Sequence, residues 1–383
     1  MLFEDAHWSD ATSRELLGLT IDRLKNLPIA LVLTYRPEFE PAWGARPYAS
    51  ALTLNRLSGY EGVALVENLA GDRSLSSEII DEIIDRTDGV PLFIEELTKA
   101  VLESADREDQ LVSVLAASPA SSLAIPATLH ASLISRLDRL GAAAKEVAQI
   151  GAVIGREFSF ELIDHVARRP QLETTLAQLA NAGLLFRRGL PPQSVYLFKH
   201  AMVQDAAYAT LLRRRRQQLH GRIAAALEQV FADLVQRQPE LLAHHLTGAA
   251  DTERAAAQWL KAGQYAAAHS AHIEAIAHLE RGLSLLRSLP DTTKRASLEI
   301  DLQLALGMSS IRARGMISPA VGDAYGRASE LAEKHRDERR LFQAIYGLYQ
   351  HNVGSGRTFA ARPLAEWLLS VTAHEDADPG LRL

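Results

Sequence analysis

The second half of this chain offers only helical sequence patterns. After Met202 neither the alternation nor the continuous apolar run of a strand recurs, and alanine and leucine follow helical spacing. Strands are therefore expected only before about residue 36 and as one later pair, Leu184–Arg188 and Val195–Lys199. The predicted fold class is mainly α.

A set of residues recurs within this helical half at the relative spacing of a tetratricopeptide unit. The first copy consists of Trp259, Gly263, Ala275, Leu279 and Gly282, with Pro290 a few residues late. Two weaker copies consist of Gly307, Tyr325, Ala328 and Leu331, and of Gly347, Ala360 and Leu364. The units are about 42 residues long, against roughly 34 in the usual repeat. Such repeats stack into an α-solenoid with a concave face, which predicts a protein partner on the array.

The segment before the repeats has the element order of a winged helix. Its two apolar strands are joined by a loop that contains Pro191 and Pro192, and they follow a run of helices. The expected helices are Thr128–Leu140, Ala142–Val153, Phe160–Ala167 and Leu172–Ala182.

The first residues predict a strand, a helix and a second strand. Met1–Phe3 is a short apolar strand, Asp10 is a suitable N-cap, and the following helix carries an apolar face. That face consists of Leu16, Leu17, Thr20, Ile21 and Leu24. Ile29–Leu33 is a continuous apolar run, as in a parallel sheet buried on both faces. Two strands cannot cover themselves, so we expect an α/β domain that lacks its first half.

A helical stretch is expected to begin at about Leu52. Ser76 or Ser77 can cap a helix that runs through Arg86, and Asp88–Pro91 ends it. Pro91 then lies near the start of the next helix, where proline is tolerated. Ser104–Ile125, rich in Ser, Ala and Asp, is predicted to be a linker.

The composition is that of an ordinary soluble globular protein, with 47% apolar and 23% charged residues in a chain of 383. Charged or polar residues interrupt every long apolar stretch, and the N-terminus turns acidic at Glu4, so neither a transmembrane helix nor a signal peptide is expected. The chain has no cysteine, which excludes disulfides and thiolate metal sites and fits a reducing compartment. We therefore expect a cytoplasmic protein that makes no membrane contact. Its oligomeric state is not fixed by the sequence.

Three short motifs contain the candidate catalytic and binding residues. Glu4-Asp5 follows the first strand, Thr34-Tyr35-Arg36 follows the second, and Gly89-Val90-Pro91 precedes a helix. In this order the motifs resemble those of the STAND class of signal-transduction ATPases, in particular the bacterial branch often fused to class III adenylate or guanylate cyclase domains. The resemblance covers nearly the whole chain.

The resemblance implies roles for four residues. Glu4 falls on the Walker B position that helps bind Mg²⁺, and Asp5 falls on the neighbouring acid that orients the attacking water. Arg36 matches an arginine close to the phosphates, and Pro91 matches the lid proline that packs on adenine. ATP and Mg²⁺ are the cofactors of the intact family, with Glu4 and Asp5 as the metal ligands only when ATP is bound.

The phosphate-binding loop of that family is missing from this sequence. It requires Gly-x-x-x-x-Gly-Lys-Ser/Thr, and none of the lysines follows a glycine. We therefore expect the chain to begin after Walker A, to bind neither ATP nor Mg²⁺ on its own, and to have no ATPase activity. Whether it is an enzyme in any other context stays undecided.

The resemblance also implies a division of the chain. The expected segments are a truncated P-loop NTPase remnant, a helical lid, a winged-helix domain and tetratricopeptide-like repeats. They occupy residues 1–50, 51–118, 119–204 and 205–383.

Lys and Arg are concentrated in residues 187–222, which contain eight of them and a single acid, although the whole chain has a net charge of −6. Arg213–Arg216 is expected on a helix that continues to about Phe231 and buries Leu219, Ile223 and Leu227. The arginines would then be solvated or paired with acids of neighbouring segments. DNA binding is not expected, because the helix that would read it, Leu172–Ala182, has no Lys or Arg.

Five histidines at 244, 245, 269, 272 and 278 lack the spacing of a metal motif and are expected to be structural. Three hypotheses on function follow from the sequence. The first is a regulatory fragment of a STAND-type ATPase with impaired ATP binding. The alternatives are a stand-alone tetratricopeptide-like interaction scaffold and a winged-helix transcription regulator.

Overall fold

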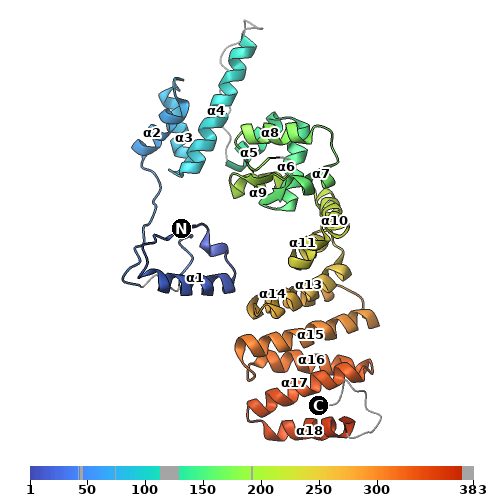
Figure 1. Cartoon of the computed structure of the whole chain (residues 1–383). Helices are drawn as coiled ribbons and strands as arrows, with labels where there is room; N and C mark the ends of the chain where they lie inside the picture. The colour runs from blue at the N-terminus through green and yellow to red at the C-terminus, as the bar shows by residue number, and fades with distance from the viewer. Residues whose placement is uncertain (42, 44–45, 74, 113–128, 191–192, 373–383) are drawn as a thin grey trace. The chain divides into compact units, whose positions relative to one another are not determined.

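The computed structural model describes residues 1–41, 43, 46–73, 75–112, 129–190 and 193–372. The fold is mainly helical, as the sequence predicted (Figure 1). The chain divides into two compact units, one of residues 52–223 and one of residues 1–51 with 224–383. Each unit is described by itself below, and the four-segment division from the sequence stays a prediction.

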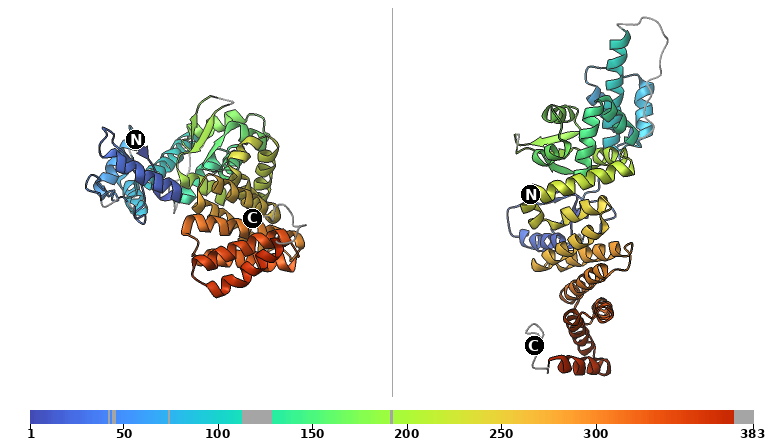
Figure 2. Two further views of the ribbon diagram at one scale, coloured as in Figure 1. Left: turned by 60° about the horizontal axis from the view of Figure 1, so that its bottom comes forward. Right: turned by 90° about the vertical axis from the view of Figure 1, so that its right-hand side faces the viewer.

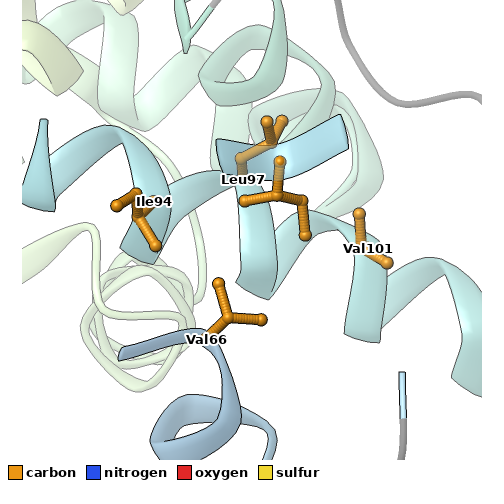
Figure 3. Close-up of a cluster of buried hydrophobic side chains, with 5 residues drawn as sticks. Val66, Ile94, Leu97 and Val101 are labelled. Carbon is orange, nitrogen blue, oxygen red and sulfur yellow. The ribbon is translucent and has the colours of Figure 1, made fainter. Parts of the chain in front are cut away.

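Three helices open the unit of residues 52–223. They are α2 (Gly59–Ala70), α3 (Ser77–Thr87) and α4 (Pro91–Val112). Ser58 and Glu61 form a reciprocal capping box on α2, and the Ser76 side chain caps α3 as predicted. The three helices enclose a small core of buried aliphatic side chains (Figure 3). Its members are Val66, Ile83, Ile94, Leu97 and Val101.

Two predictions for this region were wrong in detail. Helix begins at Gly59 and not at Leu52, because Ser58 supplies the first cap. The linker predicted from Ser104 is helical as far as Val112, since that part contains no glycine or proline to end α4. The remaining linker residues lie outside the described residues.

A small helical and antiparallel region follows in the same unit. The helices are α5 (Leu129–Arg139), α6 (Ala142–Ile154), α7 (Phe160–Ala167), α8 (Leu172–Asn181) and α9 (Ala201–Ala209). The strands are β3 (Glu157–Ser159), β4 (Leu185–Arg188) and β5 (Val195–Phe198), in the order β3-β5-β4. Helices α5 to α8 and the hairpin were predicted to within about two residues, the usual uncertainty of an element end.

The sequence did not predict β3. It is three residues long and contains only one apolar side chain on the core side, Phe158, so no alternation can be recognised. It pairs antiparallel with β5, where the Phe158 ring stacks on Tyr196 with centroids 5.9 Å apart. The contact with β5, distant in sequence, therefore makes this segment a strand.

Helix α10 (Arg213–Gln229) follows the prediction for the basic stretch. Leu219, Ile223 and Leu227 are all buried. The helix ends two residues before the predicted Phe231.

The other unit contains a succession of antiparallel helices. After α11 (Ala232–Arg237) and α12 (Pro239–Gly248) come six longer helices that pack each on the next (Figures 1 and 2). They are α13 (Thr252–Ala268), α14 (His272–Leu286), α15 (Thr293–Arg314), α16 (Pro319–Lys334), α17 (Glu338–Gly354) and α18 (Thr358–Thr372). No strand follows residue 200 in the part of the chain that the structure describes.

Three glycines of the predicted repeats lie where a side chain of the neighbouring helix packs directly against the backbone. A Cβ on Gly263 would lie 2.6 Å from Leu279. The buried ring of Tyr325 fills the space beside Gly307 and Gly347, where a Cβ would approach it to 2.7 Å and 2.5 Å. No real Cβ fits at such distances, so these helix crossings require glycine.

Residues 1–51 of this unit form a parallel strand pair with one covering helix. β1 (Leu2–Phe3) pairs with β2 (Val32–Leu33), and α1 (Ala11–Leu24) is capped by Asp10 as predicted. Leu17 and Ile21 of α1 pack with Phe3, Leu33 and Trp43. A short 3-10 turn, Ala6–Trp8, connects β1 to the helix.

Two expectations for these residues were wrong. The strand predicted over Ile29–Leu33 has only two paired residues and is not buried on both faces, since Leu2 is 63% and Val32 55% exposed. Leu16 was placed on the buried face of α1, but it is exposed. α1 covers a sheet only two strands wide, so a narrower stripe of the helix is buried.

Candidate functional site

The residues assigned to Mg²⁺ binding lie where the two parallel strands end. Glu4 and Asp5 follow β1 directly, and β2 ends at Leu33, one residue before Thr34. The Asp5 backbone N–H donates to the Thr34 hydroxyl at 2.9 Å, and the Ala6 N–H donates to the Thr34 carbonyl at 2.8 Å. Asp5 takes a left-handed conformation (φ 56°), which turns the chain sharply away from the strand. The carboxyl ends of both strands are thereby held together.

The side chains at these strand ends are mostly solvated. Glu4 and Arg36 are exposed and Asp5 is half-buried. The Arg36 guanidinium carbon lies 6.0 Å from the centroid of the Trp8 ring, which is the outer limit of a cation–π contact. The structure thus brings Glu4, Asp5 and Arg36 into one unit, with Arg36 directed toward an aromatic ring.

These residues offer only part of what a Mg²⁺–nucleotide site needs. Mg²⁺ takes one or two carboxylates and completes its shell with phosphate oxygens and water. Glu4 and Asp5 fit that carboxylate role, but a polyphosphate also requires cations or amides around its oxygens. Arg36 is the single cation that the prediction supplies. No group of three or more His, Asp or Glu side chains able to hold a metal ion occurs among the described residues.

Pro91, the fourth predicted site residue, lies in the other unit. It is the first residue of α4, as expected, and it is exposed. The turn before it is tightly built, because Leu57 N–H donates to the Gly89 carbonyl at 2.8 Å. Gly89 has φ +70°, and a Cβ there would lie 2.3 Å from the Leu57 carbonyl oxygen.

We expect Gly89→Ala to destabilise residues 52–223 by about 1–3 kcal/mol, because the substitution combines a left-handed backbone with a backbone clash. Urea unfolding monitored by circular dichroism measures the change. Gly71→Ala is the control, since Gly71 also has positive φ (+60°) but has nothing within 4 Å of its Cβ position. An equal loss in both variants would show that the Leu57 contact contributes nothing.

The sequence analysis missed a polar cluster just beyond Pro91. Glu96 on α4 and Arg136 on α5 form an ion pair with residue exposures of 2% and 4%. Arg136 also donates to the Ala182 carbonyl, at the end of α8, at 2.7 Å. The only available signal was the pair Glu95-Glu96 after the apolar start of α4, and a pair of acids does not indicate which cation it meets.

Glu95, the residue before Glu96 on α4, binds two lysines. It accepts hydrogen bonds from Lys99, one turn along α4, and from Lys199 at 2.9 Å, just after β5. These hydrogen bonds, that from Lys99 first, lower the pKa of Glu95 to about 2. Adjacent acids of α4 therefore bind different neighbours: Glu96 binds α5 and Glu95 binds the end of the hairpin.

The low pKa of Glu95 predicts an acid-sensitive contribution to stability. A carboxyl with pKa about 2 when folded and 4.5 when unfolded stabilises the fold fully above pH 4.5, and this stabilisation is lost as the pH falls toward 2. Glu95→Gln should therefore flatten the dependence of the urea midpoint on pH between 5 and 2.5. The control is Glu82→Gln, which removes an exposed pair with Arg86 within α3. Parallel profiles for wild type and Glu95→Gln would contradict this prediction.

At least two of the histidines considered as metal ligands make other contacts. The His278 ring stacks on Trp259 with centroids 5.2 Å apart, and a ring nitrogen of His269 hydrogen-bonds the Tyr265 carbonyl at 2.8 Å. Burial, and then the nearby Arg281, lowers the pKa of His244 and of His278. Both side chains are therefore neutral near pH 7.

The four consecutive arginines do not share one environment. Arg213 and Arg214 are exposed, and Arg215 pairs with Glu146 of α6 at 3.0 Å. Arg216 donates to the Tyr208 and Leu211 carbonyls, and its guanidinium carbon lies 4.2 Å from the Tyr208 ring centroid. Arg213, Arg214 and Arg215 agree with the expectation of solvated or acid-paired arginines, whereas Arg216 does not, because it binds carbonyls and an aromatic ring.

No family model matches the sequence. An uncharacterized protein of Rhizobium meliloti is 30% identical over 353 residues, which cover 90% of this chain and 34% of that protein. The chain thus spans about a third of the length of this relative.

One solved structure resembles the whole chain weakly. It is the crystal structure of a Signal Transduction ATPase with Numerous Domains (STAND) protein with a tetratricopeptide repeat sensor from Pyrococcus horikoshii. The TM-score is 0.40 and the sequence identity is 10%, over 97% of this chain and 61% of that chain. A TM-score of this size does not establish a common fold. Within the described ranges, no helix is long and apolar enough to cross a membrane.

Proposed function

We propose that this chain has a regulatory role and binds a protein partner through the helical repeats α13–α18. The observation that carries the proposal is the succession of helices that pack each on the next, in which a side chain of the neighbouring helix packs directly against the repeat residues Gly263, Gly307 and Gly347. Stacked helical repeats present extended surfaces whose usual ligands are other polypeptides. On α17 such a surface contains exposed Arg339, Gln343 and Tyr346, a mixture of polar and aromatic groups suited to recognition.

Site-specific photo-crosslinking in the host cell tests this role. A benzophenone amino acid at Tyr346 should crosslink to one reproducible protein, whereas the same amino acid at the more exposed Tyr60, in the other unit, should not. Identical sets of crosslinked proteins at both positions, or none at Tyr346, would refute the proposal.

We further propose that the chain represents the regulatory segments of a STAND-type ATPase. The order of its motifs supports this, as does the element order of residues 129–200, which we interpret as a winged helix between a helical lid and the repeats. In this interpretation Glu4 is the Walker B acid, Asp5 orients water, Arg36 lies near phosphate, and Pro91 packs on adenine. A cyclase-linked context and a cytoplasmic location belong to the same proposal.

The nucleotide part of this proposal has its own test. Without the amides and lysine of a phosphate-binding loop, two carboxylates beside a polyphosphate leave an uncompensated Coulomb repulsion. We expect the chain to hydrolyse no ATP and to bind Mg-ATP no more tightly than about millimolar, a binding free energy of about −4 kcal/mol. Isothermal titration calorimetry of the 383-residue chain measures this affinity. A micromolar dissociation constant that disappears in Glu4→Ala would disprove it.

A role in reading DNA has less support. The helix that would enter a groove, α8, contains no Lys or Arg, and Arg215 and Arg216 are already engaged within their unit. Replacing Arg213–Arg216 with glutamine should leave DNA affinity at the non-specific background in a gel-shift assay. A steep fall in affinity with loss of sequence preference would favour the transcription regulator instead.

A further inference from the structure

Arginines from two helices gather around a single carboxylate in the unit of residues 52–223. Glu146 of α6 forms ion pairs with Arg169, which follows α7, and with Arg215 of α10, the latter at 3.0 Å. Arg222 lies about two turns further along α10 and donates to the Val166 carbonyl of α7. The end of α7 and one side of α10 therefore present their arginines to the same acid.

A fourth arginine, Arg168, belongs to this cluster. It is the C-cap of α7 and has a left-handed backbone (φ 48°). Glycine and asparagine are the residues usually found in this conformation, because a larger side chain makes it unfavourable. The Arg168 side chain donates to the His165 carbonyl at 3.4 Å. The fold thus holds an arginine beside Arg169 at a backbone position that disfavours one.

Two of the four arginines are not paired with a carboxylate. Within the ranges that the structure describes, Arg168 and Arg222 donate only to carbonyl oxygens, and Asp164, one turn before Arg168, forms no ion pair. Burial, and then the charges of Arg215 and Arg168, lower the pKa of Arg222, while Glu146 acts in the opposite direction. The guanidinium groups are therefore close enough to repel one another, and a bound anion would relieve that repulsion.

We infer that Arg168 and Arg222, with Arg169 and Arg215 beside them, bind the phosphate group of a small phosphorylated anion. A phosphate monoester carries a charge of about −1.5 to −2 and three acceptor oxygens, which matches the two arginines that Glu146 leaves without a carboxylate. Guanidinium groups bind phosphate oxygens in a bidentate geometry. The inference is independent of the proposed partner surface, which belongs to the repeats of the other unit.

Isothermal titration of the full-length chain with inorganic pyrophosphate, in low-salt buffer without Mg²⁺, tests the inference. Saturable binding is expected, and Arg168→Gln and Arg222→Gln should each weaken it about tenfold through the loss of a hydrogen bond to a charged group. Arg213→Gln is the matched control, because it removes the same charge from an exposed arginine of α10 that points about 200° away from Arg215. This control should bind pyrophosphate as wild type does.

Glu146→Gln provides a second test, in a direction that damage to the fold does not produce. Glu146 is the carboxylate that competes for the same arginines, so its neutral replacement should tighten the binding of pyrophosphate. Thermal unfolding followed by circular dichroism confirms that each variant is folded. Weaker binding in a folded Glu146→Gln variant would show that the carboxylate is not a competitor and would overturn the inference.

The remaining outcomes also decide the matter. The absence of saturable pyrophosphate binding, or equal losses in Arg168→Gln and Arg213→Gln, overturns the inference. If a short DNA duplex loses affinity in Arg168→Gln and Arg222→Gln while pyrophosphate does not bind, the cluster recognises a nucleic-acid backbone and the inference is wrong. Binding that falls in both cluster variants, is unchanged in the control and rises in Glu146→Gln supports it.

Discussion

Arg136→Met is expected to destabilise residues 52–223 by about 3–5 kcal/mol, because it leaves the buried carboxylate of Glu96 without its closest cation and with only Lys99 at 4.0 Å. It also removes the hydrogen bond to the Ala182 carbonyl. Methionine keeps much of the length of the side chain, so the loss measures charge and hydrogen bonding more than volume. Urea denaturation followed by far-ultraviolet circular dichroism gives the change in the free energy of unfolding.

The double variant Glu96→Leu/Arg136→Met tests the stated cause. With both charges replaced by apolar side chains, most of the lost stability should return. Arg86→Met is the control, since Arg86 pairs with Glu82 on the exposed surface of α3 and should cost less than about 1 kcal/mol. If the double variant is as unstable as Arg136→Met alone, the effect comes from packing and not from the unpaired Glu96.

Tyr325→Ala should destabilise the repeat array by about 3–5 kcal/mol, the range for truncation of large buried side chains. The ring is buried beside Gly307 of α15 and Gly347 of α17, so its removal leaves a void next to both helices. Differential scanning calorimetry should show a lower and broader transition for this unit. Tyr346→Ala is the matched control, a tyrosine of α17 whose side chain is exposed and not buried in the array.

A second pair of variants tests the fit between ring and glycine. Gly347→Ala should destabilise the wild type by about 1–3 kcal/mol through overpacking, whereas Gly326→Ala, with nothing within 4 Å of its Cβ position, should be neutral or stabilising. In the Tyr325→Ala background the cost of Gly347→Ala should disappear. If the two substitutions change the free energy of unfolding additively, the Tyr325 ring does not limit the space beside Gly347, and this prediction is wrong.

The sequence predicted most of the helices and the hairpin because their signals are local. Asp10 and Ser76 cap their helices, and the period of Leu219, Ile223 and Leu227 identifies the buried face of α10. β3 could not be predicted, because three residues show no period and the strand exists only through its pairing with β5. The exposure of Leu16 and Val32 was not predicted for a related reason. The burial of a side chain depends on the segments that pack over its helix or strand, and the sequence of that helix or strand does not identify those segments.

The candidate site also has a part that the sequence predicted and a part that it did not. Motif order placed Glu4, Asp5 and Arg36 at strand ends, and the structure has them there, while their roles stay predictions. The contact of Glu96 with Arg136 joins residues 40 positions apart, and no spacing rule links an acid on one helix to an arginine on another. The ion pair between α4 and α5 could therefore be identified only from the structure.

The neighbouring acids of α4 have a consequence for how this sequence can change over time. Successive helical residues point about 100° apart, so Glu95 and Glu96 reach their separate partners in only one rotational setting of the helix. An inserted or deleted residue between Pro91 and Glu95 would turn both carboxylates away from Lys199 and Arg136 at once. Point substitutions on the exposed side of α4 disturb neither pair. Homologues that keep both pairs should therefore vary freely in composition here while their alignments show no gap between Pro91 and Glu96.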